Sequence, residues 1–175
     1  MNACKFQLIR TVRSMGCALL LLSATLLVGA CASYGGSGLK PGESTVAEVE
    51  AAMGVPALRW QNPDGSQQLA YPRGPAGFHN FMVTISADGR LRSIENVLDM
   101  KHFAMIEPGM SEQQVLRILG PAGCGASYFP ARDERVWVWR YLENSRVTAH
   151  FMVLFDGKTA AVRSTMSMAS DQICI

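Results

Sequence analysis

The chain has 175 residues, of which 49% are hydrophobic and 17% are charged, and its formal net charge is +2. This length is sufficient for one domain, or for two small ones, with a hydrophobic core. The small net charge and the absence of a Lys/Arg cluster predict no nucleic-acid partner.

The first 30 residues have the pattern of an export signal. Lys5, Arg10 and Arg13 precede an uncharged run over 15–30, and no acidic residue occurs before Glu43. This run is shorter than the ~20 residues that a membrane-spanning helix needs. Without the three basic residues of the signal, 13 of the 16 Lys and Arg remain against 14 acidic residues, so the mature chain has a net charge of −1.

The end of this run, Val28-Gly29-Ala30-Cys31, resembles a bacterial lipobox. The resemblance implies cleavage before Cys31, which then carries diacylglyceryl and N-acyl groups; no other cofactor is expected. Each buried CH2 of such chains contributes ~0.8 kcal/mol, so two or more chains give a stable anchor. Ala32 replaces the Asp that often retains lipoproteins in the inner membrane, which implies the periplasmic face of the outer membrane. The alternative is an ordinary signal peptide with a stray cysteine.

The anchor cysteine is followed by a short linker and, much later, by two further cysteines. Glycine and serine are frequent in 31–38, which predicts a flexible tether. Cys124 and Cys174 form an even pair, and the periplasm is oxidising, so we predict a disulfide between them. This bridge would close a loop of about 50 residues and attach the C-terminal tail to the rest of the chain. Two unpaired thiols are the alternative.

The mature chain contains an internal repeat. PGESTVAEVEAAMG at 41–54 is echoed by PGMSEQQVLRILG at 108–120. In each copy a Thr or Ser stands three positions before a Glu or Gln, the spacing of a capping box, and a Gly follows the last apolar residue. The pattern predicts two helices of about nine residues, which are too short to be stable without packing.

Strand patterns follow each predicted helix. Large side chains share one strand face in each copy: Gln67, Leu69 and Tyr71 in the first, and Trp137, Trp139 and Tyr141 in the second. Phe-Met-Val then occurs at 81–83 and at 151–153, and an Asp-Gly turn follows both. We predict an α+β protein of two tandem repeats, each a helix plus a three-stranded antiparallel meander, with the helices packed on one face of the sheet. The repeats span 39–96 and 97–175, and the second begins with a short connector helix.

This pattern resembles the SmpA/OmlA domain: Pro-Gly-x-Ser/Thr, then Val, a Leu/Met-Gly pair, an aromatic strand, and Phe-x-Val before Asp-Gly. That domain is the fold of BamE, a small lipoprotein of the outer-membrane β-barrel assembly machinery. The resemblance covers 39 to 168, in two tandem copies where BamE has one. It implies a non-enzymatic accessory or scaffold subunit in β-barrel assembly and envelope integrity, with the assembly machinery as partner. Similar tandem units occur in β-lactamase inhibitory proteins, so a periplasmic protein-binding or inhibitor module is the alternative.

Three apolar residues are candidates for a partner surface: Trp60, Met82 and Met152. Trp60 follows the first predicted helix close to a turn, where it could be exposed. Met82 and Met152 lie opposite the Phe/Val face of their strands, which helices on one side of the sheet would leave free. Packing at an edge or in a dimer is the alternative for the two methionines. The aromatic face of Trp137, Trp139 and Tyr141 is expected to pack under the helices.

Motifs of catalysis and metal binding are absent from the sequence. It contains no G-x-S-x-G, no P-loop and no H-E-x-x-H. His79 and His150 occupy nearly corresponding places before Phe-Met-Val, which indicates a shared origin by duplication, and His102 stands apart from both. We therefore predict neither an enzyme nor a metal site, and no small-molecule substrate.

Overall fold

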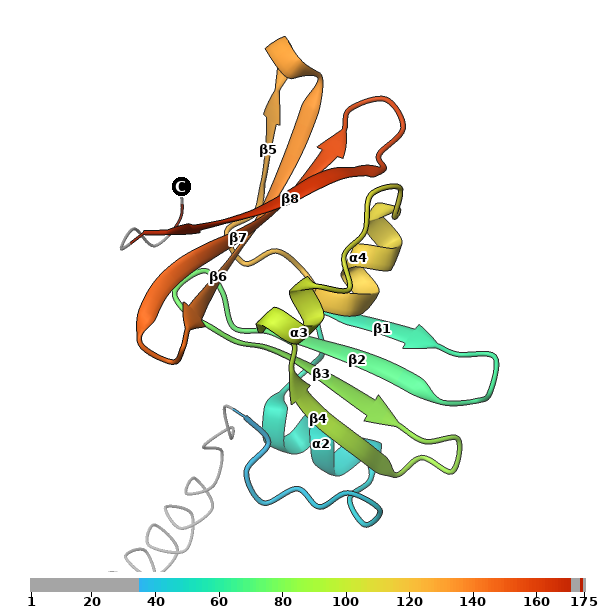
Figure 1. Cartoon of the computed structure of the whole chain (residues 1–175). Helices are drawn as coiled ribbons and strands as arrows, with labels where there is room; N and C mark the ends of the chain where they lie inside the picture. The colour runs from blue at the N-terminus through green and yellow to red at the C-terminus, as the bar shows by residue number, and fades with distance from the viewer. Residues whose placement is uncertain (1–34, 171–173, 175) are drawn as a thin grey trace, which may run out of the picture. The chain divides into compact units, whose positions relative to one another are not determined.

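The computed structural model describes residues 35–170 and Cys174, and these form two four-stranded antiparallel sheets with a few short helices (Figure 1). The strand orders are β1-β2-β3-β4 and β5-β6-β7-β8, so each sheet is a simple meander. In chain order the elements are α2 (Val46–Met53), β1 (Leu58–Gln61), β2 (Gln67–Pro72), β3 (Asn80–Ile85), β4 (Leu91–Asn96), α3 (Met100–Phe103), α4 (Glu112–Leu119), β5 (Ala126–Phe129), the 3-10 turn η2 (Pro130–Arg132), β6 (Glu134–Glu143), β7 (Val147–Asp156) and β8 (Val162–Ala169).

The predicted class, an α+β repeat of a helix plus three strands, is wrong. The described residues are mostly β, and each copy has a fourth strand, β1 or β5, that the prediction omitted. Both strands are four residues long and lie at a sheet edge, and all side chains of β5 are exposed. β5 therefore has no buried face to identify it, and β1 alternates apolar and polar residues over only four positions. They form because their backbones pair with β2 and β6.

The two predicted capping boxes are confirmed. At Thr45 and at Ser111 the side-chain oxygen accepts the N–H three residues on, and the side chain of that residue accepts the N–H of the cap. Gly54 and Gly120 end the helices at φ 87° and 70°, a region that favours glycine. The connector helix α3 spans only four residues after its cap, Asp99.

The two copies also agree in the details of their backbone pairing. One isolated bridge in each copy ties the helix cap to the start of the last strand: Thr45 to Arg90, and Ser111 to Ala161. The pairing of the last two strands shifts register after Thr84 in the first copy and after Leu154 in the second. Bulges of this kind are reproducible features of related sheets. The internal repeat of the sequence is thus also a repeat of the backbone.

Each copy buries its own core between a helix and one sheet face. In the first copy Val49 of α2 packs with Leu69, Tyr71 and Val83 of the sheet. The second copy places Val115 and Leu119 of α4 against larger residues: Trp139, Tyr141, Phe151, Val153 and Phe155. Trp139 is fully buried and Trp137 packs against the same cluster. The expectation that these aromatic side chains pack under the helices is therefore confirmed.

Helix α4 contacts both sheets, which the one-sided arrangement did not anticipate. Its inner side chains belong to the core of the second sheet, while its C-terminal end lies against the first sheet. The side-chain amide of Asn80 donates to the carbonyls of Leu119 and Pro121, both at 2.8 Å. Gln68 donates to the carbonyl of Arg117 at 2.8 Å. The first sheet thus has α2 on one face and contacts α4 with the other.

A loop of the first copy also reaches the second. Residues 73–79 join β2 to β3, and a Cβ atom added at Gly74 would collide with the backbone of Gly123. The guanidinium of Arg140 on β6 lies 4.1 Å from the ring centroid of Phe78. Through these contacts and those of α4, the two copies pack directly against each other.

Candidate functional site

Two of the three predicted partner-surface residues lie between the copies. Met82 is 6% exposed and packs with Ala70 and Val97. Trp60 is half-buried, and the guanidinium of Arg117 lies 5.4 Å from its ring centroid. The prediction that this sheet face is free is wrong, because α4 of the second copy occupies it.

A cavity of about 330 Å³ remains beside this contact, lined by side chains of both copies that include Met82, Glu95 and His102. The Nδ1 atom of His102 lies 2.7 Å from Asp99, and its Nε2 atom lies 3.9 Å from Glu95. Burial acts to raise the pKa of Asp99, but hydrogen bonds from the backbone and the imidazole of His102 outweigh it and hold this pKa below its ordinary value. Within 35–170 and Cys174, no group of three or more His, Cys, Asp or Glu is placed to hold a metal ion.

The second sheet has one face that turns away from α4, and we call it the outer face. Register places these side chains on it: Phe129 of β5, Val136 and Val138 of β6, Met152 and Leu154 of β7, and Met166 of β8. Val136, Val138 and Met152 form a small buried cluster with Cys124 and Leu154 against it. Neither this cluster nor the cavity beside it includes a residue of α2, α3 or α4.

An apolar cavity of about 270 Å³ opens on the outer face, and Phe129, Val136, Met152, Leu154 and Met166 contribute to its lining. Phe129 is 49% exposed and Met166 is 48% exposed, whereas Met152 is only 8% exposed at the base. Met152, the third residue predicted for a partner surface, therefore lies under this surface and does not project from it. Trp60 and Met82 lie at the contact between the copies, so the three candidates do not share one surface.

Charged groups at one end of the cavity neutralise one another. Glu134 is 8% exposed and lies 3.9 Å from both Arg132 and Arg163. Arg163 also donates through Nε to Asp156 at 3.0 Å. The backbone N–H of Thr159 and the guanidinium of Arg163 hold the pKa of Asp156 well below its ordinary value. This end of the outer face therefore presents little net charge to a partner.

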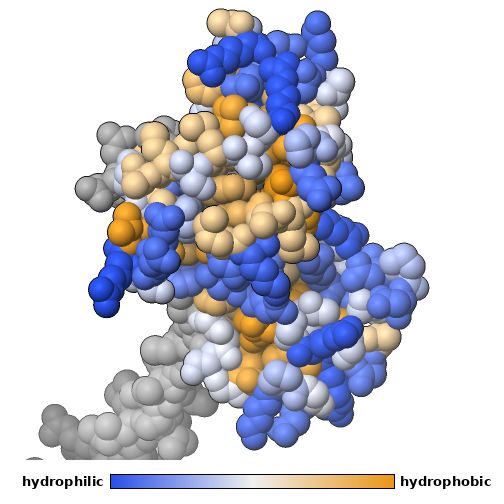
Figure 2. All heavy atoms as spheres, viewed as in Figure 1, coloured by the Kyte–Doolittle hydropathy of each residue, from blue (hydrophilic) through white to orange (hydrophobic). Residues whose placement is uncertain are grey.

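Four methionines are among the exposed apolar side chains that a partner could contact. They are Met100 and Met105 near α3, and Met166 and Met168 on β8, each at least 40% exposed. Figure 2 shows moderately hydrophobic atoms gathered across the middle of this view, where Figure 1 places β8 and α3. Flexible, polarisable methionine side chains suit contact surfaces that adapt to a partner. The alternation of Met166 and Met168 with polar residues was the available signal in the sequence.

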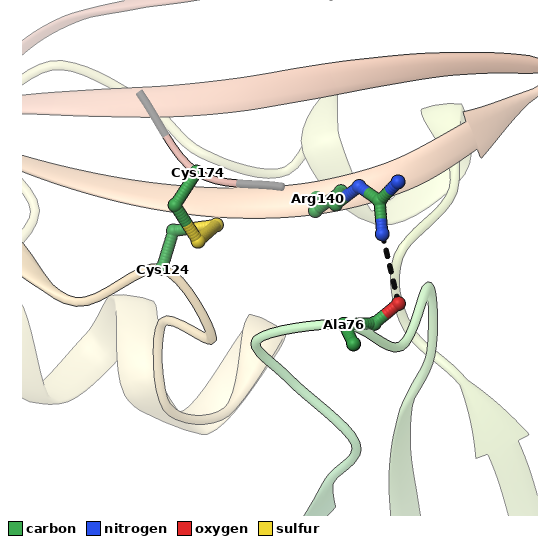
Figure 3. Close-up of a disulfide and its surroundings, with 4 residues drawn as sticks. All are labelled: Ala76, Cys124, Arg140 and Cys174. Carbon is green, nitrogen blue, oxygen red and sulfur yellow. Dashed lines mark hydrogen bonds between the residues drawn. A yellow bond between two sulfur atoms is a disulfide. The ribbon is translucent and has the colours of Figure 1, made fainter. Parts of the chain in front are cut away.

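The predicted cysteine pair is bonded in the structure. Cys124 and Cys174 form a disulfide with a Cα–Cα distance of 5.3 Å (Figure 3). Nearby, Arg140 donates through Nη1 to the carbonyl of Ala76 at 2.8 Å, so the disulfide lies close to the contact made by loop 73–79. Cys124 also packs against the outer-face cluster, which places the attachment of the C-terminal tail at the border of the outer face. Cys31 lies outside the described residues.

Comparisons with protein-family models, with curated proteins and with solved structures find no match to this chain. The resemblance to the SmpA/OmlA domain therefore rests on the sequence pattern alone. In the part of the chain that the structure describes, no helix has both the length and the apolar character needed to cross a bilayer. The aliphatic, aromatic and thioether groups of the outer face can make apolar contacts that exclude water.

Proposed function

We propose that this chain is a non-enzymatic lipoprotein of the periplasmic face of the outer membrane that binds a protein partner through the outer face of its second sheet. By its resemblance to BamE, its role is that of an accessory or scaffold subunit in β-barrel assembly. The supporting observation is the partly exposed apolar face with its cavity of about 270 Å³. Contiguous apolar surfaces with a polar rim are typical of protein-interaction sites.

The partner surface should be mainly apolar. The rim charges are already paired, Glu134 with two arginines and Asp156 with Arg163, so a strongly charged partner would gain little there. Phe129 is an exposed aromatic residue beside the cavity, the type of side chain that dominates binding energies. The partner should therefore bury Phe129 and place its own apolar side chain in the cavity.

In the proposed mechanism, the chain acts by holding its outer face close to the membrane. Acyl groups on Cys31 would hold the chain at the bilayer, and the tether 31–38 would set its reach. Confinement near the membrane raises the effective concentration of the outer face for membrane-bound partners. Hydrogen bonds from Asn80 and Arg117 join the two copies, so the anchor would hold both copies near the bilayer together.

Site-specific photo-crosslinking in native outer membranes tests the proposal. A crosslinker on β5 should capture subunits of the β-barrel assembly machinery, and Phe129→Ser should lower the yield about tenfold, since loss of an aromatic anchor costs more than ~1 kcal/mol. Tyr128→Ser is the matched control, because Tyr128 is 54% exposed on the same strand but faces the other side. Equal losses in both variants would contradict the outer face as the binding site. Capture of one periplasmic enzyme in place of assembly subunits would favour the inhibitor alternative.

The anchor is tested separately by fractionation. Cys31→Ser should move the protein from the outer-membrane fraction to the soluble periplasmic fraction, because the acyl groups would have no site of attachment. Mass spectrometry of the N-terminus supplies the independent measurement. A variant that stays in the membrane fraction would show that Cys31 is not the anchor.

A further inference from the structure

The strand β8 is an unusually open edge of the second sheet. Among the described residues it pairs only with β7, and every side chain from Arg163 to Ala169 is exposed. It is eight residues long, whereas the other edge of the same sheet, β5, has four. The edges of the first sheet are β1, which is also short, and β4, which carries Arg92 and Glu95. β8 is thus the longest edge and one of the least charged.

Soluble proteins normally guard such edges. Lysine, proline, short strands and bulges prevent the unpaired N–H and C=O groups of an edge from pairing with another chain. In β8 the only charge is Arg163, which is already bound to Asp156. The register shift lies at the start of the strand, between Leu154 and Phe155 of its neighbour. Ser164 to Ala169 therefore form a regular, uncharged edge that contains no lysine, proline or bulge to prevent such pairing.

β8 also gains little from its own sheet. Val162 is its only buried residue, so the usual stabilisation of a strand by packing of one face is nearly absent. A second neighbouring strand would satisfy the unpaired backbone groups and would bury part of the exposed side chains. The length and exposure of β8 thus indicate that a further strand pairs with its open edge.

We propose that two copies of this chain pair antiparallel through β8 across a two-fold axis and join their second sheets into one continuous sheet. The self-complementary pattern of β8 selects a second copy as the occupant. Met166 of the outer face lies opposite Met152, and Met168, on the same side of the sheet, lies opposite His150. The other face of β8 carries small or hydroxyl side chains after Arg163.

Antiparallel pairing places the methionine-bearing faces of both β8 strands on the same side of the joined sheet, because residues that oppose each other lie on the same face. A two-fold axis through Thr165 sets Ser164 against Met166 of the other copy, and Arg163 against Ser167. An axis through Met166 sets Met166 against itself and Thr165 against Ser167. In neither register do two arginines meet. The two outer faces, with Met166 between them, become one apolar surface of both copies.

The first test is the molecular mass of the full chain purified in detergent, measured by light scattering with the detergent contribution removed. The wild type should be a dimer. The variant Thr165→Lys/Ser167→Lys should raise the dimer dissociation constant about tenfold, because either register sets like charges directly opposite each other. Gln61→Lys/Gln113→Lys adds the same charge at exposed positions elsewhere and should leave the dimer intact. A wild type that is monomeric, or a dimer that the edge lysines leave unchanged, overturns the proposal.

Single cysteines locate the axis. Only a residue on the two-fold axis faces its own copy, so mild oxidation of Thr165→Cys and of Met166→Cys should give a crosslinked dimer from one variant at least fivefold more than from the other. Equal yields would mean random collision and would overturn the pairing. Crosslinking to a different protein at these positions would show that a foreign strand, and not a second copy, adds to β8. The inference is independent of the proposed function, since Phe129→Ser should lose the partner but keep the dimer.

Discussion

Asn80 links the two copies through a single side-chain amide. It is 3% exposed, and its amide nitrogen donates to the carbonyls of Leu119 and Pro121. Asn80→Ala would leave both carbonyls without this donor in a buried place, which costs about 1–3 kcal/mol. We expect the urea midpoint to fall accordingly, while Gln113→Ala, on the exposed side of α4, should change it little. An unchanged midpoint for Asn80→Ala would show that the two copies are held together by other contacts.

Asp156 makes stability depend on acidic pH. Hydrogen bonds from Thr159 and Arg163 depress its pKa in the folded state relative to the ordinary value of about 3.9. Its stabilising effect is therefore complete above that value and is lost as the pH falls toward the folded-state pKa. The melting temperature of the wild type should drop more between pH 7 and pH 3 than that of Asp156→Asn. A parallel drop in both proteins would contradict the assignment.

The same argument applies to the corresponding hairpin of the first copy. The hydroxyl of Ser86 and the backbone N–H of Arg90 lower the pKa of Asp88. Asp88→Asn should therefore weaken the acid dependence in the same direction as Asp156→Asn. The acid dependence can thus be compared between two corresponding aspartates, Asp88 in the first copy and Asp156 in the second.

At the scale of elements, the two helices of eight residues depend on their caps. Isolated helices of this length are unstable in water, so each relies on its capping box and on packing. Thr45→Ala and Ser111→Ala should each lower the free energy of unfolding by about 1 kcal/mol. Because the caps lie in different copies, the double variant should lose about the sum of the two. Chemical denaturation measures all three, and a loss near zero for either single variant would show that packing alone holds that helix.

At the scale of the whole molecule, the disulfide limits the freedom of the unfolded chain. It joins residues separated by 50 positions, and a loop of that length corresponds to a stabilisation of about 4 kcal/mol in the chain-entropy description. Cys124→Ser/Cys174→Ser should lower the free energy of unfolding by up to this amount. A reductant should have the same effect on the wild type and none on the double variant. Insensitivity of the wild type to reductant would mean that the bond contributes no stability.

Local patterns were enough to predict part of this molecule. The capping boxes, the glycine stops, the inward aromatic face of β6 and the duplication itself depend on residues within about one element of each other, where helical and strand periodicities determine which side chains meet. The pair Cys124 and Cys174 followed from counting thiols in an oxidising compartment. None of these predictions required knowledge of how the two copies meet.

The remaining features depend on contacts between residues far apart in the chain. β1 and β5 are strands only because β2 and β6 lie beside them, and β5 has no buried side chain to reveal it. Met82 was predicted on a free face, but α4 of the second copy packs there, so the open apolar face belongs to the second sheet alone. The sequence by itself determined which side chains share a face of each strand. Only the tertiary structure decided which faces are covered, because burial depends on the neighbours that folding brings from distant parts of the chain.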